Sequence, residues 1–194
     1  ESKADRSELF ITTKIFIKNF GYKKTLKSFD ESLKNLGMDY VDLILLHFPV
    51  TLLRRNSWLA LEEIKKSGRA KSIGVSNYTI KHLEDMKKYC SITPAVNQVE
   101  LHVFLQQPEL IEYCMKNNII IEAYSPLAHG NEMKNEIIND IALKHKKSYS
   151  QIMLRFLIQK GLVVIPKSTH PNRIAENVQI FDFKLDEDDM NILG

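Results

Sequence analysis

The sequence predicts an α/β fold built on a parallel sheet. Short apolar runs alternate with segments that have the 3.6-residue period of helices. Because a parallel crossover needs a dozen or more residues, this alternation favours parallel pairing of the strands. Each run also ends in a polar or ionisable residue, and in a closed barrel of such units the strand ends open on one face, where reacting groups converge. The six runs span residues 9–14, 41–47, 72–77, 95–98, 119–125 and 162–168.

Helices are predicted between these runs from apolar spacing and from residues that begin or end helices. Gly37 stops the first helix, Gly68 follows the second, and Thr79 is a suitable N-cap for the third. Pro108 is tolerable only in the first turn of the fourth helix, and Ser148 or Ser150 can cap the sixth. The predicted helices span residues 23–35, 57–66, 79–89, 106–116, 133–145, 150–159 and, as the final helix, 172–178.

The number of strand–helix units limits the architecture. Six units are found, whereas a closed βα barrel has eight. We expect one domain over residues 1–194, in which an incomplete barrel would leave strand edges unpaired. Either an N-terminal pair of units is missing from the chain, or the protein is not a closed monomeric barrel. We therefore expect a monomer if the barrel is complete and self-association if it is truly truncated.

The composition excludes several classes of function. The hydrophobic fraction of 44% and charged fraction of 26% are those of a globular protein, and a net charge of +3 is too small to indicate nucleic-acid binding. No apolar run approaches the length of a membrane span. Cys90 and Cys114 have neither metal-ligand spacing nor a disulfide framework. We expect a cytoplasmic protein with no bound metal and no membrane or nucleic-acid partner.

Six motifs, in order along the chain, resemble those of the aldo-keto reductases. The resemblance implies a (β/α)8 TIM barrel of aldo-keto reductase type, here with about six of the eight strand–helix units. It also implies NADPH-dependent reduction of aldehydes and ketones to alcohols by hydride transfer, with a small-molecule carbonyl substrate. The motifs lie at residues 11–14, 42–49, 74–77, 94–98, 123–127 and 165–168, followed by Arg173, Glu176 and Asn177.

Two residues match the family's catalytic tetrad. Lys14 matches the lysine that lowers the pKa of a tyrosine proton donor, and His47 matches the histidine that orients the carbonyl. A lysine at a buried strand end is also expected to need a nearby carboxylate. The tetrad's aspartate and tyrosine would precede Lys14, and neither Tyr22 nor Tyr40 matches the donor motif. The activity of the chain as given is therefore left open. Phe48 is expected to form a wall of the substrate pocket.

The resemblance also implies a set of cofactor-binding residues. Three polar residues would hold the nicotinamide carboxamide, and an aromatic ring would stack on the nicotinamide. Two residues would help to position the pyrophosphate, and two cations with a serine would bind the adenosine 2′-phosphate. Two more would contact the adenine. In that order, the residues are Ser76, Asn77 and Gln98; Tyr124; Ser125 and Leu127; Lys167, Ser168 and Arg173; Glu176 and Asn177.

Three alternatives to the reductase remain open at the level of sequence. The chain could be a nicotinamide-binding regulatory barrel without catalysis, or a naturally truncated, inactive member that pairs with a second copy. It could also be an unrelated barrel lyase in which Lys14 forms a Schiff base, although this leaves the 2′-phosphate cluster unexplained.

Overall fold

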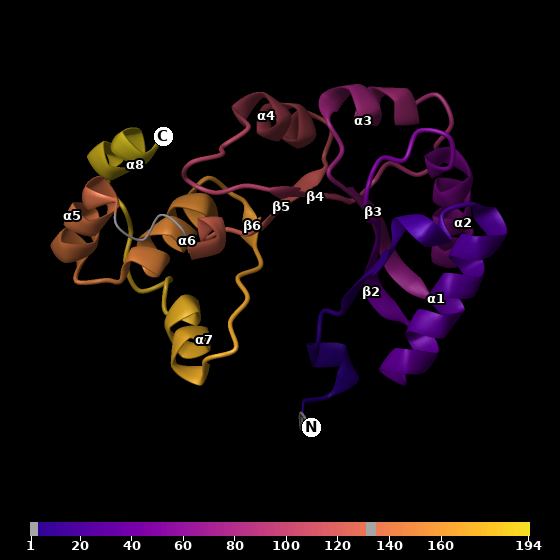
Figure 1. Cartoon of the computed structure of the whole chain (residues 1–194), viewed down its shortest axis with the longest axis horizontal. Helices are drawn as coiled ribbons and strands as arrows, with labels where there is room; N and C mark the ends of the chain where they lie inside the picture. Colours follow the sequence, from indigo (N-terminus) through magenta and orange to yellow (C-terminus); the bar gives the residue numbers. More distant parts are fainter. Residues whose placement is uncertain (1–3, 131–134) are drawn as a thin grey trace. The chain divides into compact units, whose positions relative to one another are not determined.

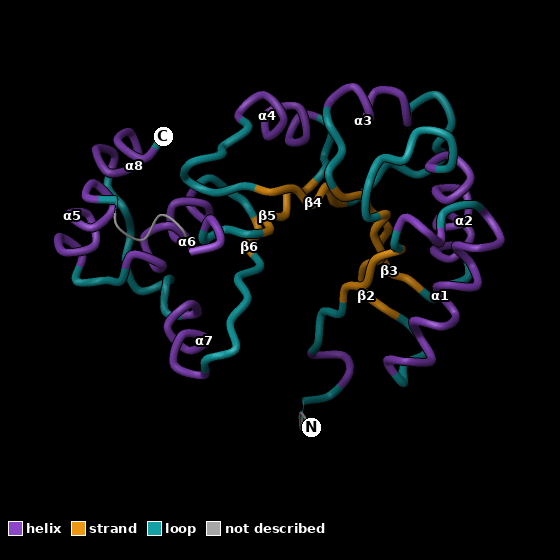
Figure 2. Tube along the Cα trace, viewed as in Figure 1, coloured by secondary structure: helices purple, strands orange, loops and turns teal. Residues whose placement is uncertain are grey.

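The computed structural model describes residues 4–130 and 135–194 of the chain. Its strands form a sheet in which they follow one another in sequence order, from β1 to β6. The pairings β1–β2, β2–β3, β3–β4 and β5–β6 are parallel, which confirms the predicted α/β fold class. The strands, coloured orange in Figure 2, are β1 (Thr12–Ile15), β2 (Val41–Leu46), β3 (Ala70–Ser76), β4 (Val96–Glu100), β5 (Ile120–Tyr124) and β6 (Val163–Val164).

Helices connect successive strands, as Figure 1 shows. Each α-helix predicted from the sequence is present, with ends that differ by a few residues. The α-helices are α1 (Tyr22–Leu36), α2 (Arg54–Lys66), α3 (Ile80–Met86), α4 (Pro108–Lys116), α5 (Glu136–His145), α6 (Tyr149–Gln159), α7 (Pro171–Val178) and α8 (Glu187–Leu193). Short 3-10 helices occur at η1 (Arg6–Glu8), η2 (Ile17–Asn19) and η3 (Ala128–Gly130).

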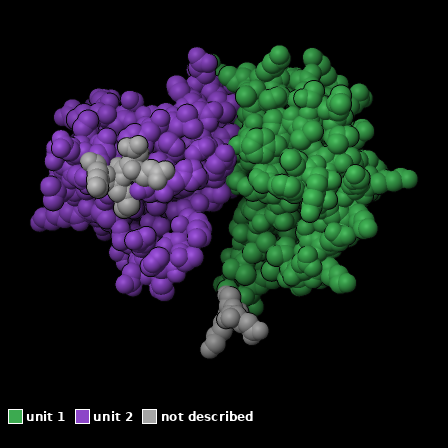
Figure 3. Space-filling view, viewed as in Figure 1, with its two compact units in different colours: residues 1–98, 116–119 green, residues 99–115, 120–194 purple. Residues whose placement is uncertain are grey.

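The chain divides into two compact units, which Figure 3 distinguishes by colour. Unit 1 consists of residues 1–98 and 116–119, and unit 2 of residues 99–115 and 120–194. The expectation of one domain over residues 1–194 stays a prediction. The two units are described separately below.

The core of unit 1 is built on β2, whose six residues are all buried. Leu43 and Leu45 pack with Val96 of β4 in one apolar cluster. Gly74 of β3 lies beside this cluster, and a Cβ atom at this position would come within 2.6 Å of the Val96 carbonyl oxygen and 2.7 Å of Leu45 Cδ2. Neither distance is sterically allowed, so the close approach of these strands requires glycine at residue 74.

The predicted caps fix several helix ends. Gly37 has φ 63° and closes α1 in the left-handed conformation, which glycine adopts without a steric penalty. Thr79 is the N-cap of α3. Of the two serines considered for α6, the N-cap is Ser148, whose hydroxyl oxygen accepts a hydrogen bond from the Gln151 backbone N–H.

Some predicted boundaries were wrong. Helix α2 begins at Arg54 rather than at residue 57, and α3 ends at Met86 rather than at residue 89. Strand β6 has only two residues, although the Ile165 N–H still donates to the Ala123 carbonyl oxygen of β5 at 3.2 Å. Residues 133 and 134 of the predicted helix 133–145 lie outside the described residues. None of the described helices is long and apolar enough to cross a membrane.

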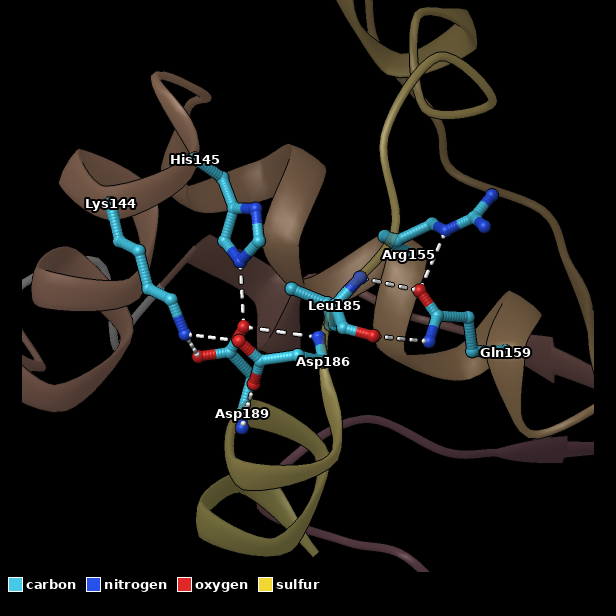
Figure 4. Close-up of polar contacts among 7 residues, drawn as sticks. All are labelled: Lys144, His145, Arg155, Gln159, Leu185, Asp186 and Asp189. Carbon is cyan, nitrogen blue, oxygen red and sulfur yellow. Dashed lines mark hydrogen bonds and ion pairs between the residues drawn. The ribbon is translucent and has the colours of Figure 1, made fainter.

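Helix α8 lies beyond residues 172–178, the last helix that the sequence pattern predicts. It is anchored to α5 in unit 2 by a charged network (Figure 4). Lys144 Nζ donates to Asp186 Oδ2 at 2.6 Å and to Asp189 Oδ1 at 2.8 Å, and His145 Nε2 lies 2.6 Å from Asp189 Oδ2. Gln159 adds hydrogen bonds to both the N–H and the carbonyl of Leu185, just before α8. These contacts fix a helix that is too short to be stable alone.

Candidate functional site

In unit 1, polar side chains predicted for the site meet where parallel strands end. Strands β3 and β4 place Ser76 opposite Gln98. The Ser76 hydroxyl donates to the Gln98 carbonyl oxygen at 2.8 Å, and the Asn77 backbone N–H donates to the same oxygen at 2.9 Å. The Asn77 side-chain amide donates to the His47 carbonyl oxygen and to the Ser76 hydroxyl, both at 3.1 Å. The structure therefore brings His47, Ser76, Asn77 and Gln98 together.

The backbone conformation of Asn77 positions its side-chain amide in the site. Its φ is 63°, a left-handed value that asparagine tolerates better than most residues. This turn follows the last residue of β3 and directs the amide toward the end of β2. An asparagine immediately after a strand therefore serves both the backbone geometry and the hydrogen bonding of the site.

Lys14 joins the same group through its ammonium. It lies within β1, one residue before the strand ends, and its Nζ donates to Gln98 Oε1. This contact is to an amide oxygen, and the carboxylate that the sequence led us to expect near Lys14 stays a prediction. The contact places the ammonium in the same group of side chains as Gln98.

His47 lies next to this charge, between two aromatic rings. Burial, with a smaller contribution from the Lys14 ammonium, lowers the pKa of His47 below its usual value of 6.5. Its imidazole is therefore neutral at pH 7 and can donate one hydrogen bond. The ring of Phe16 lies 5.6 Å from the His47 ring between centroids, and the ring of Phe48 lies 5.7 Å from it.

Phe16 was missed by the sequence analysis. Both Phe16 and Phe48 expose 48% of their surface, which is unusual for two aromatic residues that flank one histidine. The available signal was an aromatic residue just after the β1 segment that contains Lys14. Two half-exposed rings beside a neutral imidazole form an apolar surface around a single hydrogen-bond donor.

Unit 2 contains a cavity of about 560 Å³. It is formed by the loop after β5, the start of α6, the segment after β6 and α7. Seven of the eight residues predicted in unit 2 to bind the cofactor line it: Ser125, Leu127, Lys167, Ser168, Arg173, Glu176 and Asn177. The eighth, Tyr124, is the last residue of β5 and is not among the lining residues. Burial, with a further effect of the Glu100 carboxylate, raises the pKa of the Tyr124 phenol, so this ring stays neutral.

Two of the residues that line this cavity, Lys167 and Arg173, are cations. Within residues 4–130 and 135–194, neither Lys167 nor Arg173 makes an ion pair or a side-chain hydrogen bond. Both side chains are exposed to solvent. The Ser168 hydroxyl accepts a hydrogen bond from the His170 backbone N–H at 3.1 Å, which shapes the turn between the two cations. Cations that protein carboxylates leave free are suited to bind an anionic ligand.

The two cavity residues on α7, Glu176 and Asn177, are less exposed than the two cations. Asn177 is buried in α7, and the Glu176 carboxylate accepts a hydrogen bond from the hydroxyl of Ser148, the N-cap of α6. The Gln151 side-chain amide also donates to the Glu176 carbonyl oxygen at 3.2 Å. Contacts from α6 thus hold Glu176, whose carboxylate lines the cavity. Sequence analysis missed Ser148 and His129 as lining residues, since they come from segments outside the recognised motifs.

Comparison with known proteins identifies the family. The model of the aldo/keto reductase family matches residues 1–194. Glyoxal reductase of Bacillus subtilis is 47% identical over 191 residues, which cover 98% of this chain and 69% of that reductase. The crystal structure of MGS-M4, an aldo-keto reductase from a Medee basin deep-sea metagenome library, superposes with a TM-score of 0.96 at 45% identity and covers 99% of this chain and 72% of that one.

A third match includes a nicotinamide cofactor. A variant of Gox0644, solved in complex with NADPH, has a TM-score of 0.94 and 43% identity, over 97% of this chain and 70% of that chain. These structures confirm the predicted fold class, the TIM barrel of aldo-keto reductase type. With a family model that spans residues 1–194 and relatives that share nearly half of its residues, this chain belongs to the aldo/keto reductase family.

Proposed function

We propose that this chain carries out the NADPH-dependent reduction of aldehydes and ketones to alcohols. The observation that carries the proposal is the cavity in unit 2, which Lys167, Ser168 and Arg173 line and where neither cation has an ion-pair partner among the described residues. A dinucleotide with a 2′-phosphate presents a dianion that suits two cations and a hydroxyl. The names of the relatives agree with this chemistry, since one is a glyoxal reductase and another was solved with NADPH.

The residues present in the chain fit NADPH. In the cavity, Lys167, Ser168 and Arg173 would bind the 2′-phosphate, and Glu176 and Asn177 would contact the adenine. Ser125 and Leu127 would help to position the pyrophosphate. In unit 1, Ser76, Asn77 and Gln98 offer the donors and acceptors that a carboxamide requires. Tyr124, neutral and half-buried, would stack on the nicotinamide.

When bound, NADPH supplies the hydride for the reduction. The developing charge on the carbonyl oxygen requires a hydrogen-bond donor, and His47 is neutral and can provide one. Lys14 places a positive charge in the same group, which would lower the pKa of a phenolic proton donor. Phe16 and Phe48 would contact the apolar part of a small carbonyl substrate.

The sequence also led to expectations about location, oligomeric state and partners. The cytoplasmic location and the lack of nucleic-acid and membrane partners remain predictions, as does the expectation of a monomer if the barrel is complete and of self-association if it is truly truncated. The small-molecule carbonyl substrate is part of the proposal. Among the described residues, no group of three or more histidine, cysteine or acidic side chains is arranged to hold a metal ion.

The test is a steady-state assay of the intact protein with NADPH and a reactive aldehyde, such as glyoxal, beside a titration of NADPH binding. We expect aldehyde-dependent oxidation of NADPH. Binding of NADPH without turnover would contradict the reductase and support the non-catalytic nicotinamide-binding barrel. Lack of NADPH binding would contradict both. Trapping of a substrate on Lys14 by borohydride would instead indicate Schiff-base chemistry.

A further inference from the structure

We propose that Asn97 is a positioning residue for the nicotinamide end of the cofactor, because it holds the turn that carries Asn77. This inference rests on the proposed function, in which the Asn77 side chain binds the nicotinamide carboxamide. Asn97 lies in the motif at residues 94–98, but none of the roles that the resemblance implies belongs to it. The evidence is a pair of hydrogen bonds between its buried amide and the backbone of Tyr78.

The side-chain amide of Asn97 pairs with both polar backbone groups of one residue. Its Oδ1 accepts a hydrogen bond from the Tyr78 N–H at 3.3 Å, and its Nδ2 donates to the Tyr78 carbonyl oxygen at 2.9 Å. Asn97 is fully buried in β4, so both bonds are shielded from water. A primary amide offers a donor and an acceptor side by side, as the N–H and the carbonyl of a backbone residue require.

The backbone of Tyr78 needs these bonds because the chain leaves the sheet there. Strand β3 ends at Ser76, and Asn77 turns the chain with a φ of 63°. The N–H and the carbonyl of Tyr78 therefore lie beyond the strand, while the residue itself is buried. Buried backbone groups without partners destabilise a fold, so a side chain has to supply the bonds that strand pairing supplies elsewhere.

Strand β4 holds the turn on both sides of Asn77. The Asn77 N–H donates to the Gln98 carbonyl oxygen at 2.9 Å, and the next residue is bound by the Asn97 amide. The Tyr78 hydroxyl is buried and has no hydrogen-bond partner among the described residues, so the ring contributes packing without a directional contact. The peptide groups that flank Asn77 are therefore oriented by β4.

Asn97 acts through this turn and does not itself face the ligand. Successive side chains of a strand point to opposite faces of a sheet, so Asn97 and Gln98 lie on opposite faces. The Gln98 side chain contacts the Lys14 ammonium, which places the functional group of side chains on its face. The Asn77 amide reaches that group by donating to the His47 carbonyl oxygen, and its direction depends on the peptide groups beside it.

The turn should control the orientation of the nicotinamide more than the affinity for the cofactor. Hydride transfer depends steeply on geometry, since a displacement of about 1 Å can cost 10²-fold in rate. Much of the affinity for NADPH is expected from the 2′-phosphate, which Lys167 and Arg173 would bind in unit 2. Loss of the Asn97 amide should therefore lower kcat more than it weakens binding.

The experiment replaces Asn97 in the intact protein in two ways. Asn97→Leu keeps the branched shape of the side chain, whereas Asn97→Ala truncates it, so the two variants share the loss of the amide. Ser57→Ala is the matched control. Ser57 is also fully buried in unit 1, and its hydroxyl accepts from the Gly21 N–H at 2.8 Å and donates to the Leu53 carbonyl oxygen at 3.0 Å.

Two ligands separate the nicotinamide from the rest of the cofactor. NADPH and 2′-phospho-ADP-ribose, which lacks the nicotinamide, are titrated with each variant. The kcat for a reactive aldehyde, such as glyoxal, is then expressed per site that binds 2′-phospho-ADP-ribose. An unfolded fraction of the protein does not lower this ratio, so the ratio distinguishes a misplaced nicotinamide from a loss of stability.

We expect both Asn97 variants to lower kcat per binding site by about 10-fold or more. NADPH should bind about 2- to 10-fold more weakly, the effect of one hydrogen bond, and the affinity for 2′-phospho-ADP-ribose should stay within about 2-fold of the wild type. Ser57→Ala should leave kcat per binding site within about 2-fold of the wild type, although it removes the same kinds of backbone contact.

Several outcomes would overturn the inference. An unchanged kcat per binding site in both Asn97 variants would show that the amide does not position the nicotinamide. Equal losses in Ser57→Ala would assign the effect to packing in general. Equal weakening of both ligands, or failure of both Asn97 variants to fold, would show that the amide supports more than this turn. If the wild type binds neither ligand, or binds NADPH without turnover, the proposed function itself fails, and this result is distinct from the others.

Discussion

Arg173 is the residue on which the choice between NADPH and NADH should depend most. Its guanidinium lines the cavity without an ion pair among the described residues, so it can bind a 2′-phosphate in a bidentate manner. We predict that Arg173→Ala weakens NADPH binding by about 1.5–3 kcal/mol, the value of a hydrogen bond to a charged group. NADH, which lacks this phosphate, should bind almost as before. Fluorescence titration of both cofactors measures the difference.

The control for this substitution is Arg55→Ala. Arg55 is an exposed arginine of α2 in unit 1, and its removal changes the net charge equally. Equal weakening of NADPH and NADH in Arg173→Ala would contradict the assignment to the 2′-phosphate. A similar loss in Arg55→Ala would mean that the effect comes from the overall charge of the protein.

His47 should affect turnover and leave cofactor binding unchanged. We predict that His47→Ala lowers kcat/KM for an aldehyde by about 10²-fold or more, since a hydrogen-bond donor to the developing oxyanion is lost. The NADPH dissociation constant should change little. Phe48→Leu keeps the donor and removes an aromatic neighbour of the imidazole, so it separates the effect of the apolar pocket wall from that of the hydrogen bond. Loss of NADPH binding in His47→Ala would show that the histidine has a structural role.

The lowered pKa of His47 also predicts a pH profile. The neutral form is the one that donates to the carbonyl, and burial beside Lys14 keeps it neutral at pH values down to below 6.5. The contribution of His47, measured as the ratio of kcat/KM for wild type and His47→Ala, should therefore stay constant between pH 7 and 8. It should change only as the pH falls below 6.5. A ratio that changes between pH 7 and 8 would contradict a neutral imidazole.

Among single residues, the site residues at the ends of strands could be predicted from the sequence, whereas those positioned by loops could not. Ser76 and Gln98 were predictable, because parallel strands in register place their ends together. Phe16 and His129 were not, because nothing in a local pattern shows which side chains flank a histidine or line a cavity. Their positions depend on the path of the chain after β1 and β5.

Among the elements, α8 depends on its charged contacts with α5. Burial raises the pKa of Asp189, but hydrogen bonds from Lys144 and His145 outweigh this effect and lower it. We predict that Asp189→Asn destabilises the protein by about 1–3 kcal/mol, measured by urea unfolding. Asp188→Asn is the control, since Asp188 is exposed on the same helix. Equal effects of the two substitutions would contradict a specific role for the network.

The same network has a pH dependence of definite sign. A carboxyl whose pKa is lower in the folded state stabilises the protein above its unfolded pKa, about 3.9 for aspartate. This stabilisation is lost as the pH falls through the folded pKa. The difference in unfolding free energy between wild type and Asp189→Asn should therefore be constant from pH 7 to 5 and shrink below pH 4. A difference that grows on acidification would contradict the contacts described here.

Helices and strands were predictable to the extent that their signals are local. Gly37, Thr79 and Ser148 act through their own backbone or the next turn, so the ends they fix could be predicted. Helix α8 has a local signal, since the Asp186 side chain accepts from the Asp189 N–H. Its stability comes instead from Lys144 and His145, more than forty residues earlier in the chain, and a local pattern does not contain this information.

For the whole molecule, cofactor binding should appear as thermal stabilisation. A ligand that binds only the folded protein stabilises it by RT ln(1 + [L]/Kd), about 2.7 kcal/mol at one hundred times Kd. We predict that NADPH raises the Tm more than an equal concentration of NADH does. Arg173→Ala should bring the shift with NADPH closer to that with NADH, while Lys167 and Ser168 keep part of the difference. Differential scanning fluorimetry provides the measurement, and identical shifts for both cofactors in the wild type would contradict the proposed phosphate site.

The strand order of the sheet was predictable because each strand is one contiguous apolar run and neighbours in sequence are neighbours in the sheet. The division into two compact units was not, because the chain crosses between them three times, first within β4 between Gln98 and Val99. No change in composition marks that point in the sequence. Compact units are defined by where contacts between residues are dense in space. The alternation of strands and helices is uniform along the chain, so it does not show where one unit ends.

Gly74 has a practical consequence for anyone who wishes to change the substrate range of this enzyme by directed evolution. Residues near the strand ends are the natural targets of a mutant library, and Gly74 lies only two residues before Ser76. Since even one methyl group there would come within 2.6 Å of a backbone oxygen of β4, substitutions at this position are expected to disturb the packing of the strands. A library that randomises residue 74 together with Phe16 and Phe48 would contain mostly destabilised variants, whereas one that fixes the glycine and varies the two half-exposed rings would avoid this loss.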